Sequence, residues 1–240
     1  MAWPGKAGRG KAGRGMELRL PPASYTFFRN WLNCPRQAWH VNIARDIAPA
    51  ESEAMRWGTR VHEALEAYLG FDQTPLPPEL KHHEHLYQFP VGYEVDAELK
   101  LGMHEDGTYC DFFDSDAWMR GVIDVLLTKP EQPDWAVIID HKTGKIREDP
   151  TELRMHALLL HAYNPQIINV KGWYNWLRNN EMGRVYDLSD FVSIHGVLRA
   201  TQNIIASEFK LGERAFPPRQ SGLCPYCAVK SCEFNPNGRS

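Results

Sequence analysis

Residues 135–145, WAVIIDHKTGK, run from an apolar strand into a charged turn. Residues 137–139 are a continuous β-branched run, which is typical of a strand covered on both faces. Asp140 and Lys142 are two residues apart, so on an extended backbone their side chains leave the same face. Residues 143–144, Thr-Gly, then end the strand. We expect a carboxylate and an ammonium group together at the end of the most apolar strand, with a solvated surface ion pair as the alternative.

The composition indicates an ordinary globular protein. The chain has 240 residues, of which 43% are hydrophobic and 24% charged, enough for one sizeable domain with a small appendage. No apolar run approaches the ~20 residues that cross a bilayer, and no signal peptide is recognisable, so we expect a cytoplasmic protein without a membrane partner. In that compartment, five cysteines indicate metal binding or free thiols in preference to disulfides.

The N-terminal residues 1–15, MAWPGKAGRGKAGRG, differ from the rest of the chain. They contain four basic residues, no acidic residue and little that packs, so we expect a disordered basic extension ahead of Met16. Because the whole chain has a net charge of −3, the remainder is more acidic still. This charge argues against a surface coated for nucleic-acid binding, but it leaves room for a local basic groove and for carboxylates that hold metal.

Hydrophobic periodicity and turn residues predict a mixed α/β domain with a small terminal metal module. The first helix is expected to begin at the N-cap Ser24 and to be interrupted at Pro35. A second helix ends at Gly70, and a proline-rich loop occupies residues 71–90. The later elements are expected in this order: strands at 92–101, within 108–129 and at 134–143, a helix at 150–163, a strand at 166–178 and a helix at 189–212.

A second carboxylate, Asp124, lies in the apolar stretch GVIDVLL, where Gly121 allows a close backbone approach. Neighbouring strands that carry Asp124 and Asp140 bring two carboxylates together, which is costly without a cation. Mg²⁺ or Mn²⁺ removes this cost because hard oxygen ligands suit either ion. His62 is a candidate nitrogen ligand, and Lys142 is placed to orient or deprotonate a water, or to neutralise charge on a phosphorane.

Three motifs, GTRVHE (58–63), GVID (121–124) and IIDHKTGK (138–145), resemble those of the RecB-type branch of the PD-(D/E)xK nucleases. The resemblance covers roughly residues 24 to 235, and it rests on the order and spacing of the motifs. It implies an α/β fold with a restriction-endonuclease-like core, a mixed sheet flanked by helices, over residues 16–215. It also implies that His62, Asp124, Asp140 and the backbone carbonyl of His141 hold the metal, and that Lys142, Asp124 and Asp140 are catalytic.

One motif of that family is missing. The family usually continues with a helix that carries a glutamine and, four residues later, a tyrosine. Here the helix reads ELRMHALLLHAY, with Met155 or His156 where the glutamine falls. Contacts of this helix with substrate are therefore in question.

Other polar and aromatic residues have two interpretations each. Glu94 and Glu98 point the same way on the strand before Asp124, and we expect solvated carboxylates in preference to an additional metal ligand. His82, His83 and His85 lie in the proline-rich segment, where we favour a solvated loop over a second metal site. In the strand GWYNWL (172–177), we favour packing against helices over an exposed aromatic face that stacks single-stranded bases.

The cysteines Cys224, Cys227 and Cys232 are spaced as ligands of one metal centre. Three thiolates leave one position open on a tetrahedral metal or a four-iron cluster, and Cys34, directly before a proline, is the best fourth ligand. Cys110 is expected in the core or free. The pattern resembles the iron–sulfur branch of the same nucleases, which includes CRISPR-adaptation nucleases and the helicase–nuclease subunit AddB. It implies a [4Fe–4S] module over residues 216–240 with Cys34 as the fourth ligand. A zinc ion bound by the same four cysteines is the alternative.

We therefore expect a metal-dependent DNA nuclease, an exonuclease on single-stranded DNA ends. Its setting is CRISPR spacer acquisition with an integrase, or phage or repair DNA processing with a recombination partner protein. The chain has no Walker loop and so no ATP motor of its own. The alternative is a catalytically silent DNA-binding or assembly subunit in which the cluster is structural.

Overall fold

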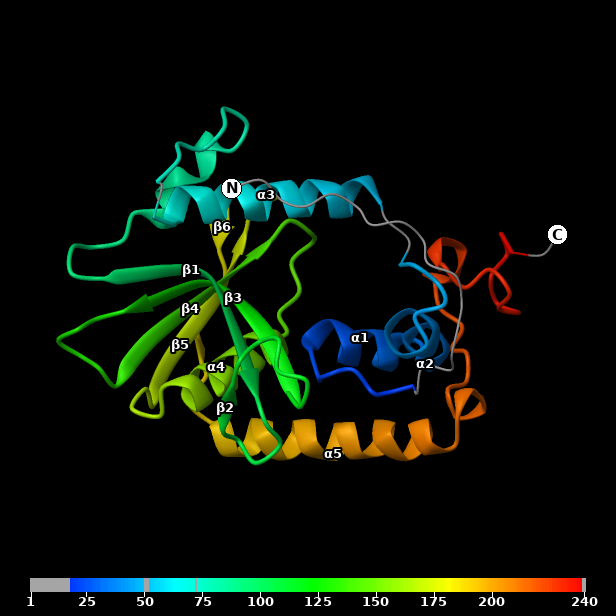
Figure 1. Cartoon of the computed structure of the whole chain (residues 1–240). Coiled ribbons are helices and arrows are strands. Elements are labelled where there is room, and N and C mark those ends of the chain that lie inside the picture. The colour runs from blue at the N-terminus through cyan, green and yellow to red at the C-terminus, as the bar shows by residue number, and fades with distance from the viewer. Residues whose placement is uncertain (1–17, 50–51, 72, 239–240) are drawn as a thin grey trace, which may run out of the picture.

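The structure is a computed structural model that describes residues 18–49, 52–71 and 73–238. The expected basic extension over residues 1–15, and Met16, lie outside these residues. The chain forms a mixed α/β fold in which a seven-stranded mixed sheet is flanked by helices (Figure 1), as the sequence predicted. Within the described ranges, no helix combines the length and the apolar character that crossing a bilayer requires.

The first helices begin where their capping residues stand. Helix α1 (Tyr25–Asn33) starts after Ser24, whose hydroxyl oxygen accepts a hydrogen bond from the Phe27 N–H at 3.2 Å. Helix α2 (Pro35–Ala38) follows with its proline at the first position and continues into a π-helical turn, Trp39–Ile43. Helix α3 (Glu53–Leu69) ends at Gly70, also as predicted.

The sheet has the order β2-β1-β3-β4-β5-β6, with β7 also paired to β5. Strands β1, β3 and β4 form the predicted antiparallel meander, whereas β4 and β5 are parallel and are joined through helix α4. The strands are β1 (Glu94–Met103), β2 (Tyr109–Cys110), β3 (Met119–Thr128), β4 (Trp135–Lys142), β5 (Asn169–Trp176), β6 (Glu181–Met182) and β7 (Tyr186–Asp187).

Helices cover the sheet on both sides. Figure 1 shows α3 and α5 (Phe191–Lys210) on opposite sides of the sheet; α4 (Thr151–Tyr163) packs on the strands and against α5. Strand β4 contributes Ile138 to one buried cluster and Ile139 to another. The prediction of a strand covered on both faces is therefore confirmed, and the polar end of β4 emerges from the most completely buried part of the sheet.

The segment 71–90 is more ordered than the sequence suggested. It contains a 3-10 helix, Lys81–Tyr87, and His83 is buried with Nδ1 2.8 Å from Asn180 Oδ1. Leu76 and Leu80 belong to a buried hydrophobic cluster that also contains Val61 and Leu65 of α3. The expectation of three solvated loop histidines is therefore wrong for His83, because these scattered leucines anchor the segment; it is correct for the exposed His82 and His85.

The C-terminal segment also has core contacts that its sequence pattern hides. Phe216 is fully buried, and its ring centroid lies 5.1 Å from that of Trp39. Val229 is buried as well. The segment includes the 3-10 turns Glu213–Ala215 and Cys224–Tyr226, and Figure 1 shows it beside α1 and α2. The tail is thus held partly by hydrophobic packing.

In β5, Tyr174, Asn175 and Trp176 are all buried. The alternative of an exposed aromatic face for base stacking is wrong for this strand. The strand ends inside the core, and its aromatic residues stabilise the fold there.

Candidate metal centre and cysteine cluster

Side chains from α3, β1 and β3 converge on one point. His62 Nδ1 lies 3.5 Å from Asp124 Oδ1 and 3.7 Å from Glu98 Oε1, and the three ligand atoms all lie within 4.8 Å of one another. Around an octahedral Mg²⁺ with bonds of 2.0–2.1 Å, neighbouring ligand atoms are about 3 Å apart and opposite ones about 4.2 Å. The three groups therefore have the spacing and the donor types that a divalent cation accepts.

Glu98 enters this group through an unusual backbone conformation. Its φ is +53°, in the left-handed region, inside a strand. The flanking pairs, Ala97–Val125 and Leu99–Ile123, place it directly opposite Asp124. Such a conformation costs on the order of 1 kcal/mol or more and recurs at functional sites. Our preference for a solvated Glu98 is thus wrong, whereas Glu94 is exposed as expected.

Asp124 and Asp140 occupy facing positions where two strands separate. The β3–β4 ladder ends at the pair Val125–Ile139, and the next positions in this register are the two aspartates. Instead of a further ladder bond, Asp124 Oδ2 accepts the His141 backbone N–H at 2.7 Å. The two aspartates are thus opposite each other in register, but the group of ligand atoms within 4.8 Å contains Asp124 with His62 and Glu98 and does not include Asp140, whose Oδ2 contacts Lys142.

Lys142 lies between two carboxylates. Its Nζ is 2.6 Å from Asp140 Oδ2, as an ion pair without hydrogen-bond alignment, and it donates a hydrogen bond to Glu152 Oε2, also at 2.6 Å. The ammonium is 5.4 Å from the centroid of the Tyr174 ring. Because the Asp140 side chain is only 4% exposed, the alternative of a solvated surface pair is wrong, and the predicted common face of Asp140 and Lys142 is confirmed.

The carboxylates control the protonation of His62. Burial alone lowers the pKa of a histidine, but contacts with the Asp124 and Glu98 carboxylates outweigh it and raise the pKa of His62 to about 10. Burial raises the pKa of Asp124, yet contacts with His62 and the His141 backbone lower it to about 2. Without a cation, an imidazolium therefore bridges the carboxylates, and a metal ion has to displace its proton.

The pair of Asp140 and Lys142 differs from the pair of Asp124 and His62 in the direction in which the pKa of its aspartate is shifted. Burial is the main cause that raises the pKa of Asp140 well above its ordinary value. The charges of Asp124 and Glu152 raise this pKa further, whereas the charge of Lys142 lowers it. Burial lowers the pKa of Lys142, but Asp140 and Glu152 outweigh it and raise that pKa, so the lysine stays charged. His141 is buried and neutral because burial lowers its pKa to about 4. Its Nδ1 lies 3.2 Å from the Tyr87 hydroxyl.

A cavity of about 460 Å³ lies beside this centre and includes Glu152 in its wall. Its wall also carries Arg45 and Arg120, with the aromatic rings of Tyr25 and Phe112. Within the described residues, Arg120 Nε is buried without a hydrogen-bond partner. The cavity therefore offers positive charge and aromatic surface next to the Lys142 ion pairs.

The helix α4 packs closely over β3. A Cβ atom at Gly121 would lie 2.7 Å from Leu159 Cδ1 and 3.0 Å from His156 Cδ2, so side chains of α4, not another backbone segment, pack directly over Gly121. Met155 and His156, the two candidate positions for the missing glutamine, are both buried, and His156 Nδ1 has no hydrogen-bond partner among the described residues.

The four predicted cluster ligands, Cys34, Cys224, Cys227 and Cys232, line one cavity and form no disulfide. Two backbone N–H groups point at sulfur: Arg219 N lies 3.4 Å from Cys34 Sγ, and Ser221 N lies 3.3 Å from Cys224 Sγ. Donors of this kind stabilise thiolates that bind metal. Cys110 lies apart from them, buried in β2.

Two site residues escaped the sequence reasoning. The sequence predicts a solvated Glu98, and its pattern gives no role to Glu152. The only local signal for Glu152 is an acidic residue in the first turn of a helix, which is common at helix N-termini for electrostatic reasons alone. Its pairing with Lys142 requires the α4 position, which the sequence does not give.

Comparisons with known proteins add little. No protein-family model matches the chain, and no curated protein matches it. One solved structure, titled "Crystal structure of SSO0001", is similar at 14% identity and a TM-score of 0.39, over 87% of this chain and 85% of that one. A similarity of this size supports no assignment.

Proposed function

We propose that this chain is a metal-dependent DNA nuclease with a RecB-like PD-(D/E)xK core. The observation that carries the proposal is the facing pair Asp124 and Asp140 at the point where β3 and β4 separate. Lys142 follows two residues later, and His62 and Glu98 lie against Asp124. The order α3, β1, β3, β4, α4, β5 around a mixed sheet is consistent with such a core.

The donor set suits Mg²⁺ or Mn²⁺, with one imidazole and carboxylate oxygens. His62, Asp124 and Glu98 would hold the ion, with Asp140 and the His141 carbonyl as the further predicted ligands. When bound, the cation would polarise the scissile phosphate and lower the pKa of a bound water. The chain itself contributes the charged Lys142, which Asp140 and Glu152 fix in place. Because its pKa is raised, Lys142 stays protonated and is a poor base. Its proposed role is therefore to orient water or to neutralise phosphate charge.

The cavity beside Glu152 supports a single-stranded substrate. Arg45 and Arg120 suit backbone phosphates, and the rings of Tyr25 and Phe112 suit unstacked bases. A cavity of about 460 Å³ has the size of a small-ligand pocket, which suits one or two nucleotides of an unpaired strand and not a duplex. We therefore propose exonuclease action on single-stranded DNA ends.

The cysteines are proposed to hold a [4Fe–4S] cluster that joins the start of the domain to its C-terminal segment. In a tetrahedral zinc site with bonds of about 2.3 Å, sulfur atoms are about 3.8 Å apart. The four cysteines line one cavity, and in a cluster each sulfur binds a different iron. One zinc ion held by the same four thiolates is the alternative.

The biological setting is proposed to be cytoplasmic DNA processing. The two candidate settings are CRISPR spacer acquisition with an integrase, and phage or repair DNA processing with a recombination partner. The resemblance of the motifs and of the cysteine pattern supports both settings.

The test is cleavage of end-labelled single-stranded DNA in Mn²⁺ by the full chain, beside Asp140→Ala and the exposed control Glu131→Ala. Shortened products are expected from wild type and from Glu131→Ala, and none from Asp140→Ala. Equal cleavage by Asp140→Ala, or no cleavage by a metal-loaded wild type that binds DNA, contradicts the proposal.

The second candidate is a catalytically silent DNA-binding or assembly subunit. The observation that favours it is the absence of the family's glutamine, because the two residues that could take its place, Met155 and His156, are buried and neither is a glutamine. Under this hypothesis the wild type binds single-stranded DNA but leaves it intact in Mg²⁺ and Mn²⁺. The same assay thus separates the two functions.

A further inference from the structure

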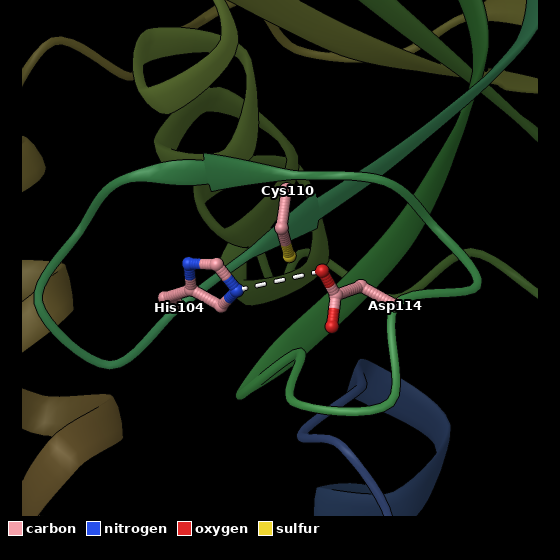
Figure 2. A group of neighbouring side chains, drawn as sticks. All are labelled: His104, Cys110 and Asp114. Carbon is pink, nitrogen blue, oxygen red and sulfur yellow. Dashed lines mark ion pairs between the residues drawn. The ribbon is translucent and has the colours of Figure 1, made fainter.

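A second group of metal-binding side chains lies at the far end of β1. His104 follows β1, Cys110 belongs to β2 and Asp114 lies in the turn before β3. Figure 2 shows the three side chains pointing toward one another. One ligand atom from each lies within 4.8 Å of the others, and His104 Nε2 is 3.7 Å from Asp114 Oδ2. None of the three has a role in the proposed nuclease centre.

A neighbouring hydroxyl holds the imidazole ring of His104 from the Nδ1 side. Its Nδ1 lies 3.3 Å from Thr108 Oγ1, and that hydroxyl donates to Asp106 Oδ1 at 2.7 Å. Because the Thr108 hydroxyl hydrogen is directed at Asp106, an Nδ1–H of His104 would donate to the Thr108 oxygen, and Nε2 would then be the nitrogen available to a metal on the side of Asp114. Metal-binding histidines are commonly oriented by such an outer partner.

Cys110 supplies a buried sulfur at the same point. The residue is 5% exposed, and no hydrogen bond to its sulfur is found within the part of the chain that the structure describes. A Cβ at Gly102 would lie 3.1 Å from this sulfur and 2.7 Å from the Asp111 carbonyl oxygen. Glycine in β1 therefore makes room for the thiol and the strand that carries it.

Two simpler explanations fit less well. In a cysteine–histidine–aspartate catalytic relay, the thiol contacts one ring nitrogen of the histidine and the carboxylate contacts the other. Here Asp114 faces Nε2, and Thr108 already occupies Nδ1. A plain ion pair leaves the convergence of Cys110 unexplained, and 3.7 Å is too long for a hydrogen bond.

We propose that His104 Nε2, Cys110 Sγ and Asp114 Oδ2 bind a Zn²⁺ ion, with water as the fourth ligand. Imidazole, thiolate and carboxylate are zinc ligands, whereas thiolate does not suit Mg²⁺. Zinc bonds of about 2.0–2.3 Å place neighbouring ligand atoms about 3.4–3.6 Å apart, close to the distances here. His104 is six residues beyond Glu98, about 20 Å along the strand, so the ion is separate from the proposed nuclease metal.

The ion would fix the turn that leads into β3. The Asp114 backbone carbonyl accepts a hydrogen bond from Arg120, and the Arg120 guanidinium lies 5.8 Å from the centroid of the Phe112 ring. Arg120 and Phe112 line the cavity of about 460 Å³ beside Glu152. Zinc would therefore stabilise one wall of that cavity without taking part in chemistry.

The test uses the full chain loaded with ¹¹³Cd²⁺ as a zinc substitute, observed by ¹¹³Cd NMR. The cadmium shift reports the number of sulfur ligands, so a one-sulfur site, a four-cysteine site and a sulfur-free site give separate resonances. We expect an intermediate, one-sulfur resonance that disappears in His104→Gln and moves toward the sulfur-free position in Cys110→Ser. In the control Cys232→Ser, this resonance stays. Its absence from the wild type, or its persistence in both site variants, overturns the proposal.

A second measurement covers the case in which Cys110→Ser folds poorly. Asp114→Asn keeps the Oδ1 acceptor of the Asp116 N–H bond but loses the charge on Oδ2. Saturating Zn²⁺ is expected to raise the melting temperature of the wild type and of the matched control Asp116→Asn by roughly 5 °C, and that of Asp114→Asn by at most about 1 °C. Equal shifts in all three proteins overturn the site.

Discussion

Lys142 and Glu152 form a 2.6 Å ion pair that joins the last residue of β4 to the first turn of α4. The same ammonium touches Asp140 at an equal distance. The orientation of Lys142 is thus set by an element that follows it in the chain, and the resemblance to a nuclease motif gives no hint of this.

The first prediction concerns Lys142 itself. Lys142→Ala and Lys142→Arg should both be nearly inactive, because a planar guanidinium cannot occupy the place of a compact ammonium between two carboxylates. Binding of single-stranded DNA, measured by anisotropy in Ca²⁺, should stay within about threefold of wild type, since the loss is in kcat. An arginine variant that keeps most of its cleavage rate in Mn²⁺ would reduce Lys142 to a source of charge.

The second prediction separates positioning from chemistry. Glu152→Gln keeps the shape but weakens the hold on Lys142, so the cleavage rate should fall roughly 10- to 100-fold while DNA affinity stays the same. The exposed Glu131→Gln is the matched control and should match wild type. If Glu152→Gln cleaves at the wild-type rate, Asp140 alone suffices to orient the lysine.

The third prediction uses the opposite pKa shifts of the two aspartates. The pKa of Asp140 is raised, chiefly by burial, so its contribution to stability is present at low pH and is lost as pH rises through the folded pKa. The pKa of Asp124 is lowered to about 2, so its contribution is present above the unfolded pKa near 3.8 and is lost as pH falls toward 2.

At pH 7 in EDTA, Asp140→Asn should therefore melt at or above the wild-type temperature, and Asp124→Asn several degrees below it. Both variants should be inactive. Thermal melts between pH 4 and 8 provide the measurement, and the same sign of change for both variants would contradict the assignment of separate electrostatic roles.

The fourth prediction concerns competition between proton and metal. His62 carries a proton in the metal-free state, with a pKa of about 10, and a cation binds only the neutral ring. Apparent Mn²⁺ affinity should rise about tenfold per pH unit between pH 6.5 and 8.5. His62→Gln should bind more weakly and with a flatter pH dependence. Calorimetry in buffers of different ionisation enthalpy should detect one proton released; no release would exclude His62 as a ligand.

The fifth prediction tests the cysteine cluster. Cys34→Ser should remove the broad absorption near 400 nm that is expected of an iron–sulfur cluster and should increase proteolysis of the C-terminal segment, since the proposed cluster would link that segment to Cys34 at the end of α1. Cys110→Ser should change neither. Zinc without this absorption would identify the alternative metal, and retention of iron by Cys34→Ser would remove Cys34 from the ligand set.

Much of the site was predictable from local pattern. The spacing of Asp140 and Lys142 predicts their common face, because side-chain alternation in a strand is fixed by covalent geometry. The caps at Ser24 and Gly70 were predicted for a similar reason, since an N-cap and a helix end depend on the residues at that point. The burial of β4 on both faces was predictable from its unbroken apolar run.

Other relationships depend on how separate elements meet. Glu98 faces Asp124 only through the β1–β3 register and a left-handed backbone, and Glu152 reaches Lys142 only because α4 packs where it does. The burial of His83 and Phe216 likewise depends on partners far away in the chain. Periodicity reports which face of an element is apolar, whereas register and packing are fixed by the summed contacts of the whole core, so only the tertiary structure decides them.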